Sequence, residues 1–522
     1  MPKPIVLVIL DGWGLSENTQ GNVIKEASLP TIEKLNKFYP MLALQASGIS
    51  VGLPWGEPGN SEVGHTVIGA GKIIYQNLPR ITLSIQDGTF SKNEILLKAL
   101  ENAKKNNSSL HLIGLTGQGS VHSHLEHLHA LLRLAQEKKI ERVFLHVFTD
   151  GRDSPPTSAT KTIADLQNKM KQIGIGKIAT LCGRNWAMDR NNNWDRIEKA
   201  YRMLTEGKGK QIQDLIKYLQ ASYEKNITDE YIEPAIVSEN GKPIALIQDG
   251  DSVIFFNFRE DRARELTKVF VLPGFEKFKR EKRLKLEFVT FTEYEKDLPT
   301  DVAFTPEKII RGLGEILSLN KLNQLRIAET EKYAHVTYFF NGGREEPFPG
   351  EDRILVPSPA VSKFDSTPEM SAPQITEGAM EAIKSEKYYF ILINYANADM
   401  VGHTGNEKAC IEAVKSIDKS LSILIPEVLK SGGCLLITAD HGNIEEVKNF
   451  YTGEIDTQHS ENPVPLWFVT AENHYSRKPA GKLLDGIKIS GMLSDIAPTI
   501  LDIAKIKKPA EMTGESLLPL LK

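Results

Sequence analysis

The chain has 522 residues, of which 41% are hydrophobic and 25% charged, and its formal net charge is −4. This composition is typical of globular proteins with more than one domain, and it lacks the positive charge of nucleic-acid-binding proteins. The three cysteines form no CxxC pair, so they indicate neither a disulfide framework nor a thiolate metal site. No apolar run reaches membrane-spanning length, and the run at residues 5–10 is too short for a secretion signal. We therefore expect a cytoplasmic protein that binds neither nucleic acid nor membranes.

Short apolar runs that are typical of buried β-strands alternate with helical patterns along the chain. They lie at residues 5–10, 144–148, 253–257, 389–394, 434–438 and 465–469. The alternation predicts an α/β protein with a largely parallel sheet.

Candidate functional residues fall into two groups along the sequence. Acids, histidines and one serine lie near both chain ends, whereas arginine-rich motifs lie between residues 152 and 262. The simplest arrangement is a discontinuous domain, residues 1–75 and 306–522, with a second domain, residues 78–301, inserted into it. The linkers are expected near residues 73–78 and 300–306, in proline-containing stretches without a clear helical pattern.

Carboxylates and imidazoles follow several predicted strands, where ligands bind in open α/β sheets. With the serine discussed below, the candidate metal ligands are Asp11, Ser61, Asp399, His403, Asp440, His441 and His459. Asp399 and His403 are four residues apart, so one helical turn places them on one face. A set of carboxylates and histidines without cysteine favours manganese or zinc, and seven ligands suit two ions better than one. The alternative for any single member is a helix cap or a hydrogen-bonded core histidine.

Ser61 lies in GNSEVGH, residues 59–65, where a helix can begin. Helix N-termini favour phosphate, and metal coordination can activate a serine hydroxyl as a nucleophile. The alternative is that Ser61 is only a helix cap. The motif is not a GxSxG elbow.

Arginines recur at or after predicted strand ends in the middle of the chain. They are Arg152, Arg184, Arg190, Arg259 and Arg262. Guanidinium groups bind phosphate and carboxylate in a bidentate manner, so this set suits a ligand with two anionic groups. Surface salt bridges with Asp189, Glu260 and Asp261 are the alternative. In the histidine-rich segment at residues 121–129, only His122 is a candidate substrate contact.

Six short motifs together closely resemble the cofactor-independent phosphoglycerate mutases, a branch of the alkaline phosphatase superfamily. They are VILDGWG (8–14), GNSEVGH (59–65), DGRD (150–153), NYANADMVGHTG (394–405), TADHGN (438–443) and TGESLLPLL (513–521). The resemblance covers essentially the whole chain. It implies a two-domain α/β fold, in which a second α/β domain is inserted into an alkaline-phosphatase-like metal domain. It also implies glycolytic interconversion of 3-phosphoglycerate and 2-phosphoglycerate through a phosphoserine, without bisphosphoglycerate.

The resemblance also implies roles for individual residues. One Mn²⁺ (or Zn²⁺ or another divalent metal) is expected at Asp399, His403 and His459, and a second at Asp11, Ser61, Asp440 and His441. The substrate pocket is expected to contain His122, Arg152, Asp153, Arg184, Arg190, Arg259, Arg262 and Lys332. Ser61 corresponds to the nucleophile, Asp153 is the candidate general acid and base, and Lys332 would stabilise the transferring phosphoryl group. The family also suggests a monomer.

Three other functions remain open at this point. A phosphatase of the same superfamily would let water finish the reaction, but it would not need the arginine pocket to retain its product. A mutase acting on a sugar phosphate is disfavoured by the DGRD and GNSEVGH matches. A non-catalytic protein that binds metal and phosphate is disfavoured because every proposed ligand and Ser61 are present.

Overall fold

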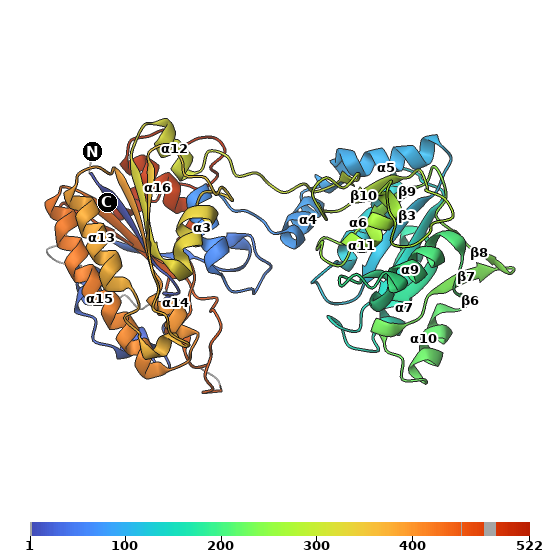
Figure 1. Ribbon diagram of the computed structural model, residues 1–522, viewed down its shortest axis with the longest axis horizontal. Helices are drawn as coiled ribbons and strands as arrows, with labels where there is room; N and C mark the ends of the chain where they lie inside the picture. The colour runs from blue at the N-terminus through green and yellow to red at the C-terminus, as the bar shows by residue number, and fades with distance from the viewer. Residues whose placement is uncertain (1–2, 450–451, 474–486) are drawn as a thin grey trace. The chain divides into compact units, whose positions relative to one another are not determined.

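The computed structural model describes residues 3–449, 452–473 and 487–522. The chain divides into two compact units, one of residues 1–76 and 307–522 and one of residues 77–306 (Figure 1). Each unit has its own β-sheet covered by helices, which confirms the predicted α/β class. In the described part of the chain, no helix combines the length and the apolar character needed to cross a bilayer.

Among the described residues, the sheet of the discontinuous unit has eight strands. In order across the sheet they are β13 (Glu351–Val356), β12 (Gln324–Glu329), β14 (Phe390–Tyr395), β1 (Ile5–Leu10), β15 (Cys434–Thr438), β16 (Val464–Val469), β2 (Met41–Gln45) and β17 (Ile489–Met492). The pairing is parallel except at β16, which runs antiparallel to both β15 and β2. The prediction of a largely parallel sheet is therefore confirmed for this unit.

Every residue of β1, β14 and β15 is buried, because helices cover both faces of the sheet. The helices of this unit are α1 (Val23–Glu26), α2 (Pro30–Phe38), α3 (Ser61–Ala70), α12 (Leu313–Leu319), α13 (Ala372–Lys384), α14 (Asn397–Gly402), α15 (Glu407–Lys430), α16 (Ile496–Ile503) and α17 (Leu518–Leu521). Figure 1 shows α13 and α15 on one face of the sheet and α3, α12 and α16 on the other. The apolar runs at residues 5–10, 389–394 and 434–438 thus lie at the buried centre of this unit.

The inserted unit contains a second, mostly parallel sheet. Its strands are, in order, β11 (Asp301–Val302), β10 (Glu287–Thr290), β9 (Ser252–Phe255), β3 (Leu110–Thr116), β4 (Val143–Thr149), β5 (Lys177–Gly183), β7 (Ala235–Glu239) and β6 (Lys210–Ile212), with β8 (Lys242–Pro243) paired to β7. Its helices are α4 (Asn77–Gln86), α5 (Glu94–Lys105), α6 (Leu125–Glu137), α7 (Ala159–Ile173), α8 (Arg184–Ala187), α9 (Trp194–Glu206), α10 (Leu215–Tyr223) and α11 (Arg264–Val271). Antiparallel pairing is confined to β7, which pairs in this way with β5 and β8.

The stretches in which the linkers are expected, near residues 73–78 and 300–306, include the start of a helix and a short strand. The chain enters the inserted unit at Asn77, where α4 begins. Pro79 is tolerated there because the first helical turn needs no intrahelical N–H donor. In the second stretch, β11 pairs with β10, so residues 301–302 extend the sheet of the inserted unit. Local proline content therefore did not exclude regular structure in either stretch.

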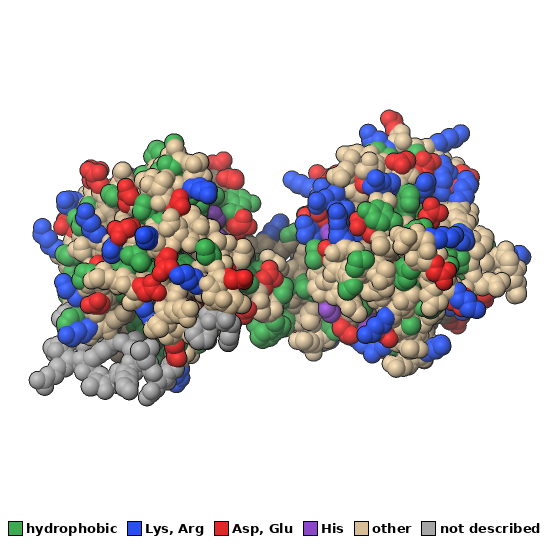
Figure 2. All heavy atoms as spheres, turned by 90° about the horizontal axis from the view of Figure 1, so that it is seen from below, with side chains coloured by type: hydrophobic (Ala, Val, Ile, Leu, Met, Phe, Trp, Pro, Cys, Tyr) green, Lys and Arg blue, Asp and Glu red, His purple; other side chains and the backbone are tan. Residues whose placement is uncertain are grey.

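The surface carries charges of both signs. On the face drawn in Figure 2, acidic and basic side chains are interspersed on both units. This mixture agrees with the small net charge of the chain. A strong local electrostatic field must therefore come from charged residues that the fold brings together.

Candidate active site

Three carboxylates meet at one edge of the sheet in the discontinuous unit. β14, β1 and β15 are adjacent and parallel, so their carboxyl ends lie together. Asp11 directly follows β1, Asp399 lies in α14 after β14, and Asp440 follows β15. At Gly12, where φ is +75°, a Cβ would lie 2.8 Å from Cα of Asp399. A glycine is therefore required for this close approach.

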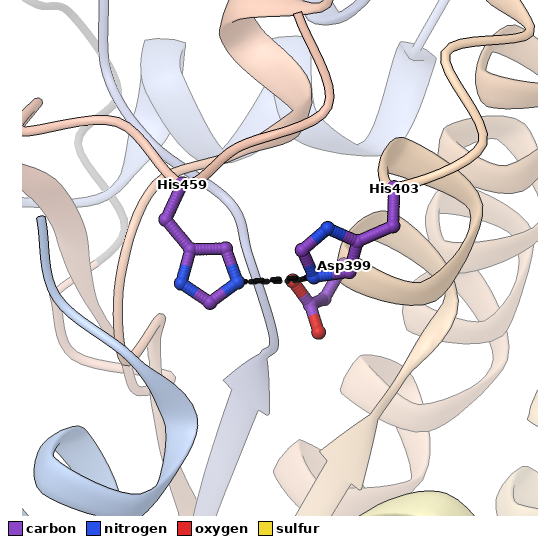
Figure 3. A group of neighbouring side chains, drawn as sticks. All are labelled: Asp399, His403 and His459. Carbon is purple, nitrogen blue, oxygen red and sulfur yellow. Dashed lines mark hydrogen bonds and ion pairs between the residues drawn. The ribbon is translucent and has the colours of Figure 1, made fainter. Parts of the chain in front are cut away.

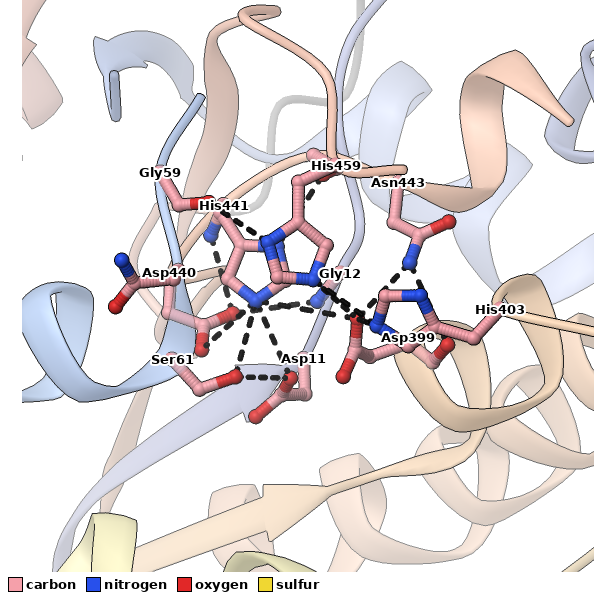
Figure 4. A network of polar contacts seen from close by, with 12 residues as sticks. Asp11, Gly12, Gly59, Ser61, Asp399, His403, Asp440, His441, Asn443 and His459 are labelled. Atoms are coloured by element: carbon pink, nitrogen blue, oxygen red, sulfur yellow. Dashed lines mark hydrogen bonds and ion pairs between the residues drawn. The ribbon is translucent and has the colours of Figure 1, made fainter. Parts of the chain in front are cut away.

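Ser61 is the first residue of α3, but it does not cap the helix. The cap is Asn60, whose side chain accepts a hydrogen bond from the backbone N–H of Val63 at 2.9 Å. The Ser61 hydroxyl instead donates to Oδ1 of Asp11 at 3.1 Å and lies 3.0 Å from Nε2 of His441 (Figure 4). The alternative in which Ser61 only caps the helix is thus wrong.

Asp399, His403 and His459 form one compact group (Figure 3). Oδ1 of Asp399 lies 3.2 Å from Nε2 of each histidine, and the two Nε2 atoms are 3.1 Å apart. Asp399 also belongs to a neighbouring group with Asp11 and His441. The two sets of candidate ligands therefore adjoin one another.

The candidate ligand histidines share one hydrogen-bond pattern. Nδ1 of His403 lies 2.7 Å from the carbonyl of Thr457, and Nδ1 of His459 lies 2.8 Å from that of Gly59. Nδ1 of His441 is 3.2 Å from its neighbouring carbonyl. Because a carbonyl only accepts, Nδ1 carries a proton in each ring, and in the neutral imidazole Nε2 is the free donor atom for a metal. All three Nε2 atoms face the carboxylates (Figure 4).

The donor atoms fit a divalent metal centre. Oδ2 of Asp440 is buried and accepts no hydrogen bond from the residues that the structure describes, although Nδ1 of His65 lies 3.2 Å away. A buried carboxylate oxygen that accepts no hydrogen bond is costly, and a cation would satisfy it. The surrounding oxygen and imidazole donors, without thiolate, suit manganese or zinc.

Lys332, which follows β12, provides a cation within this cluster. Its Nζ lies 2.6 Å from Oδ1 of Asp11, 2.6 Å from Oδ2 of Asp399 and 2.7 Å from Oγ of Ser61. Burial raises the pKa values of Asp11 and Asp399, but Lys332 and nearby histidines outweigh it and hold both well below the usual range. Burial lowers the pKa of His441, yet the charges of the three carboxylates raise it to about 9. The carboxylates of Asp11 and Asp399 are therefore ionised and attract cations.

Several residues that the sequence did not single out support the candidate ligands. Asn443 donates from Nδ2 to Oδ1 of Asp399 at 2.9 Å. Glu445 is buried and accepts from the backbone N–H groups of Gly14 and Asn443, each at 2.9 Å, and from the side chain of Ser460. Because Ser460 is adjacent to His459, Glu445 joins the loop of that histidine to the loop after β15. The sequence signals were weak: Asn443 ends the motif at residues 438–443, Glu445 lies two residues beyond it, and Ser460 follows His459.

In the inserted unit, Arg184 lies at the carboxyl ends of adjacent parallel strands. It follows β5 directly, and its Nη1 donates to Oδ1 of Asp150 and to Oδ2 of Asp153, both at 2.5 Å. Arg184 and Asp150 are buried, whereas Asp153 is partly exposed. Burial raises the pKa of Asp150, but hydrogen bonds from Ser154 and Arg184 outweigh it and lower that pKa. The Arg184 guanidinium is thus held by two carboxylates.

His122 lies between two acidic groups of the same unit. Its Nε2 is 3.9 Å from Oδ2 of Asp153, and its Nδ1 is 3.6 Å from Oδ1 of Asp261. Asp261 also accepts a hydrogen bond from Arg190 at 2.8 Å and lies 3.3 Å from Nε of Arg259. Burial, and next the charge of Arg184, lower the pKa of His122 to about 4, so it is neutral at pH 7. Arg190 and Arg259 therefore do contact an acidic neighbour, as the salt-bridge alternative for the arginines describes.

Arg262 and Arg152 complete the group of arginines. Arg262 donates from Nη1 to the carbonyl of Met188 at 3.1 Å. Burial lowers the pKa of Arg262, and the charges of Arg184, Arg190 and Arg152 lower it further. Nε of Arg152 lies 3.8 Å from the carboxylate of Glu230. The like charges that act on Arg262 concentrate positive potential, which favours an anionic ligand.

The remaining histidines of the segment at residues 121–129 have other contacts. His124 caps α6, and Nε2 of buried His127 lies 3.0 Å from Oγ1 of Thr82. Nδ1 of His129 lies 3.1 Å from the carboxylate of Glu126. These contacts agree with packing and surface roles.

Comparisons with known proteins agree on one family. The family described as "BPG-independent PGAM N-terminus" matches residues 81–296. A 2,3-bisphosphoglycerate-independent phosphoglycerate mutase of Clostridium acetobutylicum is 51% identical over 516 residues, and one of Clostridium perfringens is 49% identical over 517, in each case covering 99% of both chains. A structure of Leishmania mexicana phosphoglycerate mutase, described as at low cobalt concentration, has a TM-score of 0.52 and 30% identity. It covers 99% of this chain and 97% of that one.

Replacing Arg184 with methionine is expected to destabilise the protein by about 3–5 kcal/mol at pH 7, because it leaves the buried Asp150 without its cation. In the native protein the lowered pKa of Asp150 contributes stability above its unfolded pKa, and this contribution is lost as pH falls through the folded pKa. In the variant, burial would raise the pKa of Asp150, so the deficit should shrink towards pH 4. Urea unfolding at both pH values measures this difference.

The control is Arg196→Met in the same unit. Arg196 is partly exposed and lies 3.5 Å from buried Asp189, which keeps hydrogen bonds from Asn191 and Asn193 without it, so its loss should cost less than about 1 kcal/mol. Equal unfolding midpoints for Arg184→Met and Arg196→Met would contradict the assigned role of the buried pair.

Proposed function

Because the chain belongs to the family of 2,3-bisphosphoglycerate-independent phosphoglycerate mutases, we propose that it interconverts 3-phosphoglycerate and 2-phosphoglycerate with Ser61 as the phosphorylated nucleophile. One observation carries the assignment of Ser61. Its hydroxyl, at the start of α3, lies within 3.1 Å of Lys332, Asp11 and His441. A helix N-terminus and an adjacent ammonium both favour a phosphoryl group.

The reaction consists of two half-reactions with opposite directions. In the first, the bond between phosphorus and the 3-hydroxyl oxygen breaks as a bond to Oγ of Ser61 forms. The serine loses one proton and the glycerate oxygen gains one, so the proton count is unchanged. In the second, the 2-hydroxyl takes the phosphoryl group from Ser61. The product is an isomer of the substrate, and no bisphosphoglycerate is required.

Lys332 is proposed to stabilise the charge that develops during each transfer. Its Nζ donates to Oγ of Ser61 at 2.7 Å, and it is fixed by two carboxylates. A donor fixed before the reaction stabilises a developing negative charge without having to reorganise. The helix that begins at Ser61 adds backbone N–H groups on the same side.

Two divalent ions are proposed to complete this unit. Asp399, His403 and His459 would hold one, and Asp11, Ser61, Asp440 and His441 would hold the other. When bound, such ions supply positive charge that activates the serine hydroxyl and neutralises phosphoryl oxygens. Manganese, with zinc as an alternative, is our proposal for their identity.

The inserted unit is proposed to hold the glycerate part of the substrate, while the discontinuous unit acts as the metal-binding domain. The carboxylate of glycerate would bind among Arg152, Arg184, Arg190, Arg259 and Arg262, with His122 alongside. Asp153 would act as general acid and base, since its Oδ2 is held by Arg184 and its side chain is partly exposed. A monomeric state, a cytoplasmic location and the likeness of the metal domain to alkaline phosphatases remain predictions.

Removal of metal should abolish activity. The buried carboxylates and inward-facing Nε2 atoms motivate this prediction. Dialysis against a chelator should remove activity, and added Mn²⁺ should restore it. Full activity in protein that elemental analysis finds free of metal would rule out the two-ion proposal.

Ser61→Ala should remove nearly all mutase activity, a loss of at least about 10³-fold, because no other oxygen replaces the nucleophile. Ser422→Ala, at an exposed position of α15, is the control and should keep full activity. Acid-quenched native enzyme should yield a phosphopeptide that contains Ser61. An active Ser61→Ala enzyme, or phosphate found on another residue, would show that the nucleophile is misassigned.

Following the phosphate distinguishes the mutase from other activities. If the inserted unit retains glycerate after Ser61 is phosphorylated, recapture is intramolecular, with an effective concentration on the order of 10⁵ M or more. A sample of 3-phosphoglycerate labelled in both carbon and phosphorus is mixed with unlabelled substrate, without bisphosphoglycerate. The 2-phosphoglycerate formed should carry both labels on the same molecule.

Each other activity gives a different distribution of label. A phosphatase would release labelled inorganic phosphate, and a mutase that depends on bisphosphoglycerate would stall or scramble phosphate among carbon skeletons. Extensive scrambling would contradict the retention of glycerate, even in an enzyme that interconverts the two acids.

A further inference from the structure

His65 is fully buried one helical turn after Ser61 and has no role in the steps described above. Its Nδ1 lies 2.8 Å from the carbonyl oxygen of Ser61 and 3.2 Å from Oδ2 of Asp440, and its Nε2 lies 3.0 Å from Nδ2 of Asn394. Asn394, in β14, also donates from Nδ2 to Oδ2 of Asp11 at 2.7 Å. The imidazole therefore connects the backbone of the nucleophile to a carboxylate on the neighbouring strand.

The chemistry of the partners fixes the direction of these hydrogen bonds. The carboxylate of Asp11 only accepts, so Asn394 presents its NH₂ group rather than its oxygen. One hydrogen of that group points to Asp11, and the other points to Nε2 of His65. The carbonyl of Ser61 also only accepts, so Nδ1 of His65 carries the proton. These constraints select one orientation of the amide and one neutral tautomer of the imidazole.

The resulting contacts form a closed ring around the nucleophile. From the carbonyl of Ser61 the ring passes through His65 and Asn394 to Oδ2 of Asp11. It returns from Oδ1 of Asp11 to the Ser61 hydroxyl at 3.1 Å. Every member is buried, so water cannot replace a lost contact without entering the core. Both oxygens of Asp11 thus have assigned partners.

We propose that His65 is a positioning residue that acts through Asn394 to fix the Asp11 carboxylate against Ser61. This inference rests on the proposed function, in which Asp11 and Ser61 hold one of the two ions. Without His65, the second hydrogen of the Asn394 amide loses its acceptor, and the amide can turn away from Asp11. Side chains that orient metal ligands in this way typically change metal affinity by about 10–100-fold.

The test is a double-mutant cycle with Mn²⁺ binding as the readout. His65→Ala, Asn394→Ala and the double variant are titrated calorimetrically with Mn²⁺ as full-length, metal-stripped proteins. Each single variant should bind one of the two ions about 10–100-fold more weakly and the other with native affinity. Because both residues act on Asp11 along one path, the double variant should be little worse than either single variant.

A conservative variant separates the two contacts of the imidazole. His65→Asn keeps a donor near the position of Nδ1, for the Ser61 carbonyl and for Oδ2 of Asp440, but has no acceptor at Nε2 for Asn394. It should lose affinity for the same ion as His65→Ala does. Native Mn²⁺ affinity in a folded His65→Asn protein would overturn the proposed path through Asn394. If His65→Ala fails to fold, the His65→Asn variant still tests this path.

The matched control is His335→Ala. The ring centroid of His335 lies 5.5 Å from that of His65, and within the described residues it makes no hydrogen bond to Ser61, Asn394 or Asp11. It should leave both Mn²⁺ affinities unchanged. Additive losses in the double variant, equal weakening of both ions, or no weakening would refute the role of His65. A native protein that binds no Mn²⁺ would instead refute the proposed metal centre.

Discussion

Three buried carboxylates, those of Asp11, Asp399 and Asp440, lie close together at one sheet edge. The arrangement of the discontinuous unit around this edge follows from the need of these carboxylates for cations. Parallel pairing of β14, β1 and β15 brings them there, and burial alone would favour their neutral forms. Lys332 ion-pairs with two of them and keeps them charged. The same concentration of negative charge that costs stability makes the edge suitable for divalent ions and, through them, for a phosphoryl group.

The inserted unit also brings like charges together, but there the charges are positive. Its strand ends gather guanidinium groups, and carboxylates hold some of them in place. Arg184 is fixed by Asp150 and Asp153, whereas Arg190 and Arg259 share Asp261. Such pairing limits the rotamers of long side chains before a ligand arrives, which reduces the entropy lost on binding. An ion pair in this pocket is therefore compatible with substrate binding, and the two explanations of the arginines do not exclude one another.

Much of the fold could be predicted from the sequence because buried parallel strands leave an unmistakable apolar run. The run at residues 434–438 coincides with β15, and Asp440 and His441 follow it as expected. Which strands pair with one another could not be predicted from these apolar runs. β16 is as apolar as β15 but runs antiparallel to it, since strand direction depends on the connecting loop. Likewise, the choice between cap and nucleophile for Ser61 depended on its neighbour Asn60, which caps α3 instead.

The residues that orient the candidate site could not be predicted from the sequence, for a different reason. The candidate ligand histidines are oriented by backbone carbonyls of Thr457, Gly59 and Gly442, and a carbonyl is present whatever the residue type. A sequence motif can therefore show that an imidazole is present. Its tautomer depends on which backbone carbonyl lies beside Nδ1 in the folded chain. His65 lies within the motif at residues 59–65, yet Asn394, which contacts its Nε2, is 329 positions away. Long-range hydrogen bonds of this kind become visible only when the sheet places both residues beside the same carboxylate.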